Sequence, residues 1–256
     1  MTLLRLDSVT RQFGGLIAVD AVSFDVPAQG VTAIIGPNGA GKTTLFNVIS
    51  GFVAPSEGHV LFAGQHITGL PPEAIAKRGL VRTFQLAQLF DNLTVLENVK
   101  VGRHLHTTGG LLAALMPFRA AHSEAEVEET SKALLQQVGL ASQAGMLASM
   151  LPYGRKRLLE IARALAAEPK ILLLDEPAAG LNRDETTRLA SLLRQIASSG
   201  IAVLLIEHDM SLVMNVADRI AVLDFGKLIA QGTPSDVQQN PDVIAAYLGT
   251  AVAAHA

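Results

Sequence analysis

The chain has 256 residues, of which 49% are hydrophobic and 17% are charged, and its formal net charge is −3. A chain of this length and apolar content can bury a large core, which excludes a disordered protein. The slightly negative charge argues against a nucleic-acid-binding protein, which would carry a basic surface. The absence of cysteine excludes disulfides, catalytic thiolates and cysteine-ligated zinc.

No stretch of the sequence has the pattern of a targeting or membrane-spanning segment. The N-terminal residues MTLLRLDSVTRQF carry charges inside their apolar run, unlike a signal peptide. The longest apolar runs, such as IAVLLI, are much shorter than the roughly 20 residues of a membrane span. We therefore expect a cytoplasmic protein that reaches a membrane only through a partner.

Short apolar runs predict the strands of an α/β fold. Early runs alternate apolar and polar residues, which is typical of a half-exposed antiparallel sheet. They lie near residues 3–6, 22–26, 31–36 and 59–63, and another run lies near 80–84. The runs at 171–176 and 202–207, ILLLDE and AVLLIE, are apolar up to a final acid, which predicts central parallel strands. A last pair within 220–232 is joined by a predicted turn at Phe225-Gly226.

Helical periodicity appears in five segments of the chain. It marks residues 42–51, 94–104, 123–138, 155–167 and 183–198. Strand signals are almost absent between residues 86 and 162, so we expect a helical lobe inserted into the α/β core. The last residues, 251–256, are expected to form a frayed tail.

A glycine-rich motif, GPNGAGKTT, lies between a predicted strand and a predicted helix. It matches G-x-x-x-x-G-K-[ST], in which backbone N–H groups surround phosphate oxygens. The Lys42 ammonium would neutralise the β- and γ-phosphates, and the Thr43 hydroxyl would bind Mg²⁺. The predicted nucleotide contacts are Gly36, Pro37, Asn38, Gly39, Ala40, Gly41, Lys42, Thr43 and Thr44.

Polar side chains follow the predicted central strands. Asp175 ends one apolar run and is expected to hold Mg²⁺, while Glu176 is expected to orient or deprotonate the attacking water. His208 follows the next strand and is expected to contact the γ-phosphate. Gln85 directly follows the run near 80–84. Its amide could bind Mg²⁺ and couple the presence of the γ-phosphate to the position of the helical lobe. Taken alone, the acids could also be a solvated turn, and the histidine or glutamine an ordinary structural residue.

A cluster of cations begins the helical pattern after residue 154. The sequence LPYGRKR at 151–157 places Arg155, Lys156 and Arg157 where a helix N-terminus favours anions. An anion supplied from elsewhere would explain this choice. An exposed basic helix turn is the alternative explanation.

In this order and at these separations, the motifs resemble those of an ABC transporter ATPase subunit. They are GPNGAGKTT, Gln85, LPYGR, ILLLDEP, AAGLN and His208. The segments RQFGGLIAVD, VRTFQLAQLFDNLTVLENV and IEHDM are similar to those of branched-chain amino acid importers, although urea or amide importers look alike. The resemblance implies one P-loop NTPase domain over 1–256, with a mixed sheet, an antiparallel β edge and an inserted helical subdomain. Its core would comprise 1–85 and 163–250, its helical subdomain 86–162, and its tail 251–256.

The resemblance also implies partners. Two ATPase subunits, identical or related, would pair head to tail, with ATP between one phosphate loop and the partner's LPYGR turn. Tyr153 and Gly154 would then contact nucleotide, and Phe13 would stack on adenine. The pair would act on integral membrane permease subunits at the cytoplasmic face of the inner membrane, and only indirectly on a substrate-binding protein.

The sequence departs from the family pattern L-S-G-G-Q. Pro152 replaces the serine, Tyr153 a glycine and Arg155 the glutamine, and Asn182 stands where the family commonly has aspartate. A degenerate, regulatory subunit is therefore one alternative. A P-loop GTPase or small-molecule kinase is another, although the sequence lacks an Asn-Lys-x-Asp guanine motif.

Overall fold

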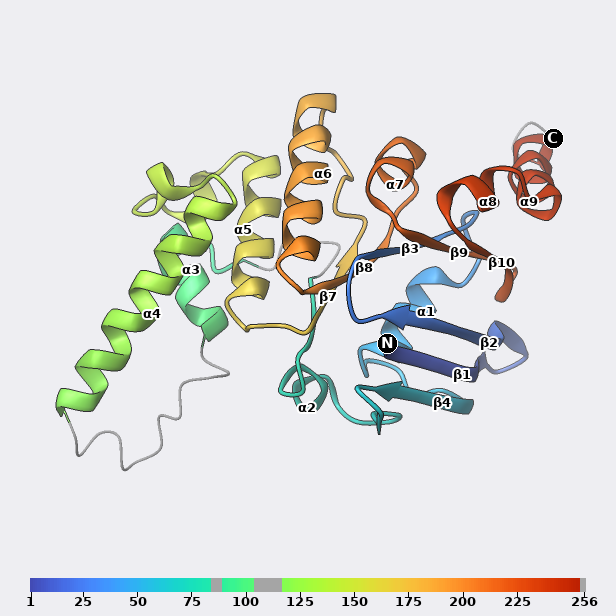
Figure 1. Ribbon diagram of the computed structural model, residues 1–256, viewed down its shortest axis with the longest axis horizontal. Helices are drawn as coiled ribbons and strands as arrows, with labels where there is room; N and C mark the ends of the chain where they lie inside the picture. The colour runs from blue at the N-terminus through green and yellow to red at the C-terminus, as the bar shows by residue number, and fades with distance from the viewer. Residues whose placement is uncertain (84–88, 104–116, 254–256) are drawn as a thin grey trace.

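The computed structural model describes residues 1–83, 89–103 and 117–253, and it contains two β-sheets with helices around them (Figure 1). The first sheet is antiparallel, in the order β2-β1-β4-β5. Its strands are β1 (Thr2–Phe13), β2 (Leu16–Pro27), β4 (Glu57–Phe62) and β5 (Gln65–His66). The antiparallel sheet predicted from the early alternating runs is confirmed. The run near 31–36 is the exception, because it forms a strand of the second sheet.

The second sheet has the strand order β10-β9-β3-β8-β7-β6. All neighbours in it are parallel except β9 and β10, which form the predicted hairpin. The expected mixed sheet is therefore confirmed. Its strands are β3 (Val31–Ile35), β6 (Leu80–Arg82), β7 (Ile171–Asp175), β8 (Ala202–Ile206), β9 (Arg219–Asp224) and β10 (Lys227–Gly232).

The central strands divide their side chains between two hydrophobic cores. Every residue of β3, β7 and β8 is buried. On β7, Leu172 and Leu174 belong to the core shared with the long helices, whereas Ile171 and Leu173 face the first sheet. This follows from the two-residue period of a strand. Burial of each such side chain contributes about 1.5–3 kcal/mol to stability. This explains why the runs that form β7 and β8 are apolar throughout.

The helices lie mainly in the second half of the chain. Three of them, α3 (Val95–Gly102), α4 (Pro117–Gln137) and α5 (Tyr153–Leu165), lie together at the end of the molecule opposite the first sheet (Figure 1). They occupy much of the predicted helical lobe, whose boundary at residue 162 falls inside α5. The remaining helices are α1 (Lys42–Ile49), α2 (Pro72–Ala76), α6 (Arg183–Ser198), α7 (Met210–Val216), α8 (Pro234–Gln238) and α9 (Pro241–Ala253).

Helix starts follow local capping chemistry. Thr94 and Glu97 form a capping box at α3, and Asn182 and Glu185 form another at α6, so these helices begin where their first N–H groups find side-chain acceptors. Helix α4 begins at Pro117, six residues before the predicted start at 123. Helix α9 extends to Ala253, into the segment expected to be frayed.

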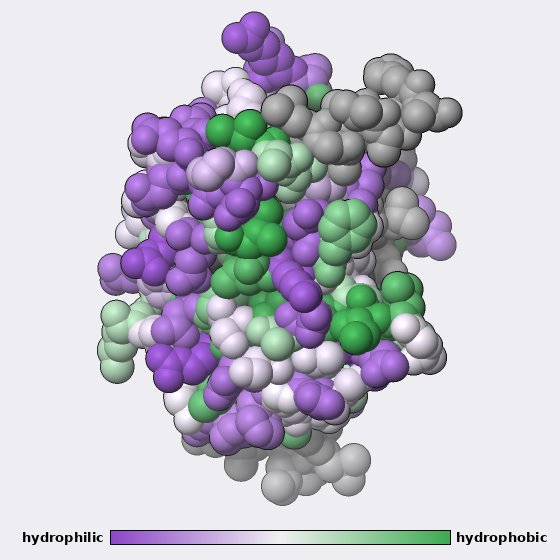
Figure 2. All heavy atoms as spheres, turned by 90° about the vertical axis from the view of Figure 1, so that its right-hand side faces the viewer, coloured by the Kyte–Doolittle hydropathy of each residue, from purple (hydrophilic) through white to green (hydrophobic). Residues whose placement is uncertain are grey.

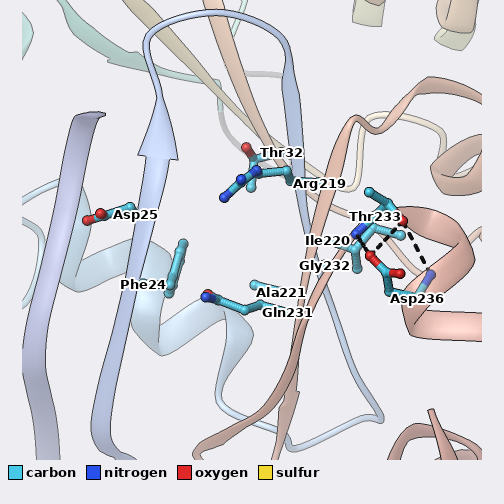
Figure 3. A pocket seen from close by; sticks show the side chains of 10 residues that line it. All are labelled: Phe24, Asp25, Thr32, Arg219, Ile220, Ala221, Gln231, Gly232, Thr233 and Asp236. Atoms are coloured by element: carbon cyan, nitrogen blue, oxygen red, sulfur yellow. Dashed lines mark hydrogen bonds between the residues drawn. The ribbon is translucent and has the colours of Figure 1, made fainter. Parts of the chain in front are cut away.

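A small cavity of about 250 Å³ lies between the two sheets at one edge (Figure 3). Phe24 of β2 borders it on one side, and Arg219 reaches into it from β9 (Figure 3). It lies beside Thr32, near the start of β3, whereas the glycine-rich motif follows the end of that strand. Within the described ranges, no helix is both long and apolar enough to cross a membrane.

Candidate nucleotide-binding site

The glycine-rich motif forms a tight loop between β3 and α1. Gly36 has a φ of +149° and Gly41, the residue before α1, a φ of +94°. A Cβ at Gly36 would collide with the carbonyl oxygen of Leu223, and one at Gly41 with that of Ala18. Glycine is therefore required both for the backbone conformation and for the close approach of neighbouring chain. No side chain caps the N-terminus of α1, and its first turn contains no acid, so its N–H groups face an opening that suits an anion.

Lys42 is held inside the loop. Its side chain is buried, and Nζ donates to the carbonyl oxygens of Gly36 at 2.7 Å and Pro37 at 2.8 Å. Burial lowers the pKa of this ammonium, and the negative charges of Glu176 and Asp175 oppose that shift. The cation is thus oriented by the loop and lies in the field of both strand-end acids. Thr43 and Thr44 follow it in the first turn of α1, and the Thr43 residue is exposed.

A hollow of about 500 Å³ opens beside the loop. Loop residues 38–44 and Glu176 form one part of its lining, and the other part comes from the β1–β2 and β9–β10 hairpins. Hydrophobic side chains gather across the centre of the face that carries these hairpins (Figure 2). The exposed apolar residues of the hairpins that line the hollow are Leu16, Ile17 and Phe225. The hollow therefore combines N–H donors and a cation with an apolar wall.

Phe13 lies at the end of β1, on the hairpin that supplies Leu16 and Ile17. Its side chain is 43% exposed, and the guanidinium of Arg11 lies 4.3 Å from its ring centroid. One face of the ring is thus covered by a cation, and a flat base could stack only on the other.

Asp175 lies at the end of β7, with only 3% of its side chain exposed. Its Oδ2 accepts a hydrogen bond from Nη2 of Arg82 at 2.8 Å. Nη1 of Arg82 also donates to Asn47 at 2.7 Å and to Ser50 at 2.9 Å, both on or next to α1. A buried carboxylate needs such a partner, and here the partner connects three elements of the site.

Glu176 and His208 approach each other from neighbouring strand ends. Glu176 has a left-handed backbone, with φ 45°, and its N–H donates to the carbonyl oxygen of Ile206 at 3.0 Å. Its Oε1 lies 3.8 Å from Nδ1 of His208. Parallel β7 and β8 bring the two side chains to the same edge of the sheet. The structure thus places Lys42, Asp175, Glu176 and His208 around one end of the phosphate loop.

Glu207 and Tyr247 at this edge, besides Arg82, were not predicted. Glu207 is fully buried between the loops that carry Glu176 and His208. Its sequence signal is the acid that ends AVLLIE, the same signal that identified Asp175 and Glu176. Tyr247 of α9 is partly buried against the N–H of Gly36. Burial raises the pKa of its hydroxyl, and that N–H opposes the rise. No local pattern could relate Tyr247 to a loop so distant in sequence.

The turn LPYGRKR begins α5, with Pro152 as its N-cap. Each of its cations has a partner in this chain. Arg155 donates to the carbonyl of Gly139 at 2.9 Å, Lys156 lies 3.6 Å from Asp91, and buried Arg157 lies 3.1 Å from Glu160. The cluster therefore has an intramolecular explanation and does not need an anion from elsewhere.

Tyr153 and Gly154 form the first turn of α5 and contact the loop before α6. The Tyr153 ring is 46% exposed and packs beside Gly180, while Gly154 leaves no room for a Cβ against Glu185. This turn has its own surroundings, separate from the lining of the phosphate-loop hollow. Gln85, the remaining predicted contact, lies outside the described residues. Among the described residues, no group of three or more acids or histidines is arranged to hold a metal ion.

Known proteins match the chain over almost its entire length. The family described as ABC transporter matches residues 19–179, and the branched-chain amino acid ATP-binding cassette transporter family matches residues 227–253. The chain is 46% identical to the high-affinity branched-chain amino acid transport ATP-binding protein LivG of Escherichia coli K12, covering 97% of this chain and 98% of LivG. It is also 46% identical to BraF of Pseudomonas aeruginosa, a protein of the same description, with the same coverage.

Solved structures agree with this assignment. A nucleotide-free ATP-binding cassette from an ABC transporter superimposes with a TM-score of 0.83 at 34% identity, covering 96% of this chain and 99% of that one. An ADP-bound cassette of an ABC transporter gives a TM-score of 0.85 at 35% identity, covering 97% and 99%. The resemblance noted in the motifs is thus confirmed, and the chain belongs to the ABC transporter family as one of its nucleotide-binding ATPases.

Proposed function

We propose that this chain is the ATP-hydrolysing motor subunit of an importer of branched-chain amino acids. The observation that carries the mechanism is the convergence of Lys42, Asp175, Glu176 and His208 beside the open N-terminus of α1. The cargo rests on the relatives, which are described as branched-chain amino acid transport ATP-binding proteins.

The phosphate loop binds the triphosphate in this proposal. Its N–H groups and the N-terminal field of α1 receive the phosphate oxygens. The Lys42 ammonium exchanges the carbonyl oxygens of Gly36 and Pro37 for β- and γ-phosphate oxygens. Because the loop already orients this ammonium, little reorganisation is needed. Phe13 and the apolar wall of the hollow receive the base.

The residues present suit Mg²⁺, which favours hard oxygen ligands. The hydroxyl of Thr43 and the carboxylate of Asp175 would hold it. The family resemblance makes the amide of Gln85 a further ligand. The ion supplies neutralisation of the charge that develops on the phosphate oxygens. Arg82 holds Asp175 in place through Oδ2.

Glu176 acts as the general base. Its carboxylate takes a proton from a water molecule whose oxygen forms a bond to the γ-phosphorus. The bond from that phosphorus to the bridging oxygen breaks, and ADP leaves with the electron pair. His208, whose Nδ1 lies 3.8 Å from the Glu176 carboxylate, orients Glu176 and contacts the γ-phosphate.

The active unit in this proposal contains a second ATPase subunit, identical or related. The Tyr153–Gly154 turn of each subunit covers the nucleotide held by the other, and the helical lobe transmits closure to permease subunits. The chain is then peripheral to the cytoplasmic face of the inner membrane. A substrate-binding protein would meet the permeases and not this chain.

Reconstitution with the membrane subunits in liposomes tests the proposal. Leucine uptake should require ATP on the side of the liposome membrane where this chain is bound, and urea should not be taken up. Lys42→Ala in every copy should abolish both uptake and ATP hydrolysis, whereas Lys227→Ala, on the β9–β10 hairpin, should preserve them. Uptake of urea instead of leucine would contradict the cargo, and continued transport after loss of Lys42 would contradict the motor function.

A further inference from the structure

Glu207 directly follows β8, and its side chain is completely buried. Both of its carboxylate oxygens accept backbone hydrogen bonds. Oε1 accepts the N–H of Ala178 at 2.8 Å, and Oε2 accepts those of His208 at 2.9 Å and Asp209 at 3.1 Å. Burying a carboxylate is costly unless its oxygens are hydrogen-bonded, so this arrangement holds three specific N–H groups in place.

The three N–H groups belong to the two loops that carry the predicted hydrolytic residues. Ala178 lies two residues after Glu176, in the loop that leaves β7. His208 and Asp209 lie in the loop that leaves β8, and Asp209 caps α7 through Leu212. Glu207 therefore bridges the loops from two neighbouring parallel strands.

The bridge is needed because the Glu176 turn is strained. A φ of 45° is unfavourable for a residue with a Cβ and persists only where the surroundings enforce it. Two contacts enforce it from β8, namely the Glu176 N–H bond to Ile206 and the Ala178 N–H bond to Glu207. Removing the second would allow the carboxylate of Glu176 to shift relative to His208.

We propose that Glu207 is a positioning residue for ATP hydrolysis, fixing the separation and orientation of the Glu176 carboxylate and the His208 imidazole. Nδ1 of His208 lies 3.8 Å from Oε1 of Glu176 and 3.8 Å from Oε2 of Glu207. The ring thus stands between a carboxylate open to the hollow and one that is fully buried. This role depends on the proposed function, because it acts on the same hydrolytic step.

The test uses Glu207→Gln in the reconstituted transporter. The amide keeps the size of the side chain but turns an NH₂ group towards a backbone N–H, so one loop loses its acceptor. We expect kcat for ATP hydrolysis to fall roughly 10- to 100-fold, as displacement of reacting groups generally causes, with KM changed less than about twofold. The matched control is Asp218→Asn, whose carboxylate accepts the Val31 N–H at 2.7 Å at the opposite end of β3. This control should keep the parent kcat.

A double-mutant cycle separates positioning from a general loss of stability. In a Glu176→Gln background, where the general base that Glu207 positions is already removed, Glu207→Gln should cost less than about twofold in kcat, because residues that act as a unit are not additive. An equal fold-loss in both backgrounds would overturn the proposal, as would a parent-like kcat or a rise in KM alone. If Glu207→Gln does not fold, Glu207→Asp serves instead, since its shorter carboxylate cannot reach both loops.

Failure of this inference can be distinguished from failure of the proposed function. Lys42→Ala tests the function without touching Glu207. If it abolishes hydrolysis while Glu207→Gln leaves kcat unchanged, only the positioning role is wrong. If hydrolysis survives Lys42→Ala, the proposed function itself is wrong.

Discussion

At the scale of single residues, two aromatic side chains near the hollow, Phe13 and Phe225, differ in how they could contact the base of the nucleotide. Arg11 already covers one face of Phe13, whereas Phe225 is 83% exposed at the β9–β10 turn. A base stacked on Phe13 would gain face contact on the ring's other side without any reading of its edge atoms. The base preference should therefore be weak.

Phe13→Ala should weaken ATP binding by roughly tenfold, the size expected for loss of one stacked aromatic contact. The binding of GTP should weaken by a similar factor. Titration with a fluorescent nucleotide analogue, competed with ATP or GTP, measures both constants. Phe225→Ala is the comparison variant on the opposite hairpin, where the apolar wall is expected to contribute less than the stacked ring. A larger loss for Phe225→Ala would place the base against β9–β10 and contradict the assignment of Phe13.

Most of the candidate site could be predicted residue by residue, because its signals are local. The glycines and Lys42 lie within one motif, and Asp175, Glu176 and His208 each follow an apolar run. Arg82 and Glu207 were not predicted. The partner of Arg82 lies 93 positions away, and a buried acid in the sequence looks like an exposed one. Pairing and burial are tertiary facts, which periodicity does not encode.

At the scale of secondary-structure elements, Arg82 links several elements next to the phosphate loop through hydrogen bonds and an ion pair. Its side chain is 8% exposed and pairs with Asp175, which is 3% exposed, while also bonding to Asn47 and Ser50. It therefore joins β6, α1 and β7 from one position. Removing it leaves a buried negative charge without this cation, which is far more costly than replacing both charges together.

Arg82→Met should lower the free energy of unfolding by about 3–5 kcal/mol, the usual cost of breaking a buried ion pair from one side. Adding Asp175→Asn to that variant should restore part of the loss, because no unpaired carboxylate then remains. Urea denaturation of the four proteins of this cycle measures both effects. The surface pair Arg5–Asp25, with 56% and 41% of its side chains exposed, is the control and should contribute much less. Additive costs for Arg82→Met and Asp175→Asn would show that the two charges are not coupled.

Elements with uninterrupted periodicity could be predicted from the sequence, and interrupted ones could not. Helix α6 has the predicted bounds, 183–198, because its capping box and apolar stripe agree. Strand β1 is longer than its predicted core of 3–6 because register shifts, one of them between Leu6 and Val9, break its alternation. Helices α2 and α8 have only five residues each, which is too short for a 3.6-residue period to be visible.

At the scale of the whole molecule, the phosphate-loop hollow and the turn that is proposed to cover a nucleotide are separate parts of the described chain. The phosphate loop and Glu176 line one hollow, with His208 beside Glu176, whereas Tyr153 and Gly154 pack beside Gly180 and Glu185 and are not part of that lining. In the proposal, a chain's own turn therefore does not cover the nucleotide that the chain holds. A second subunit would complete the site, and ATP would then stabilise the pair as long as it remained intact.

Glu176→Gln should separate binding from turnover and so expose this pairing. The amide keeps the shape of the side chain but cannot accept the proton of the attacking water, so hydrolysis should fall at least about 100-fold. ATP affinity should stay close to that of the parent, because the phosphate loop and Lys42 are unchanged. Size-exclusion chromatography with ATP should show a dimer for the variant, and ADP should leave it monomeric. Combining Glu176→Gln with Lys42→Ala should abolish the dimer. Hydrolysis at the parent rate would show that Glu176 is not the base, and a persistent monomer with ATP bound would point to a distinct ATPase as the required partner.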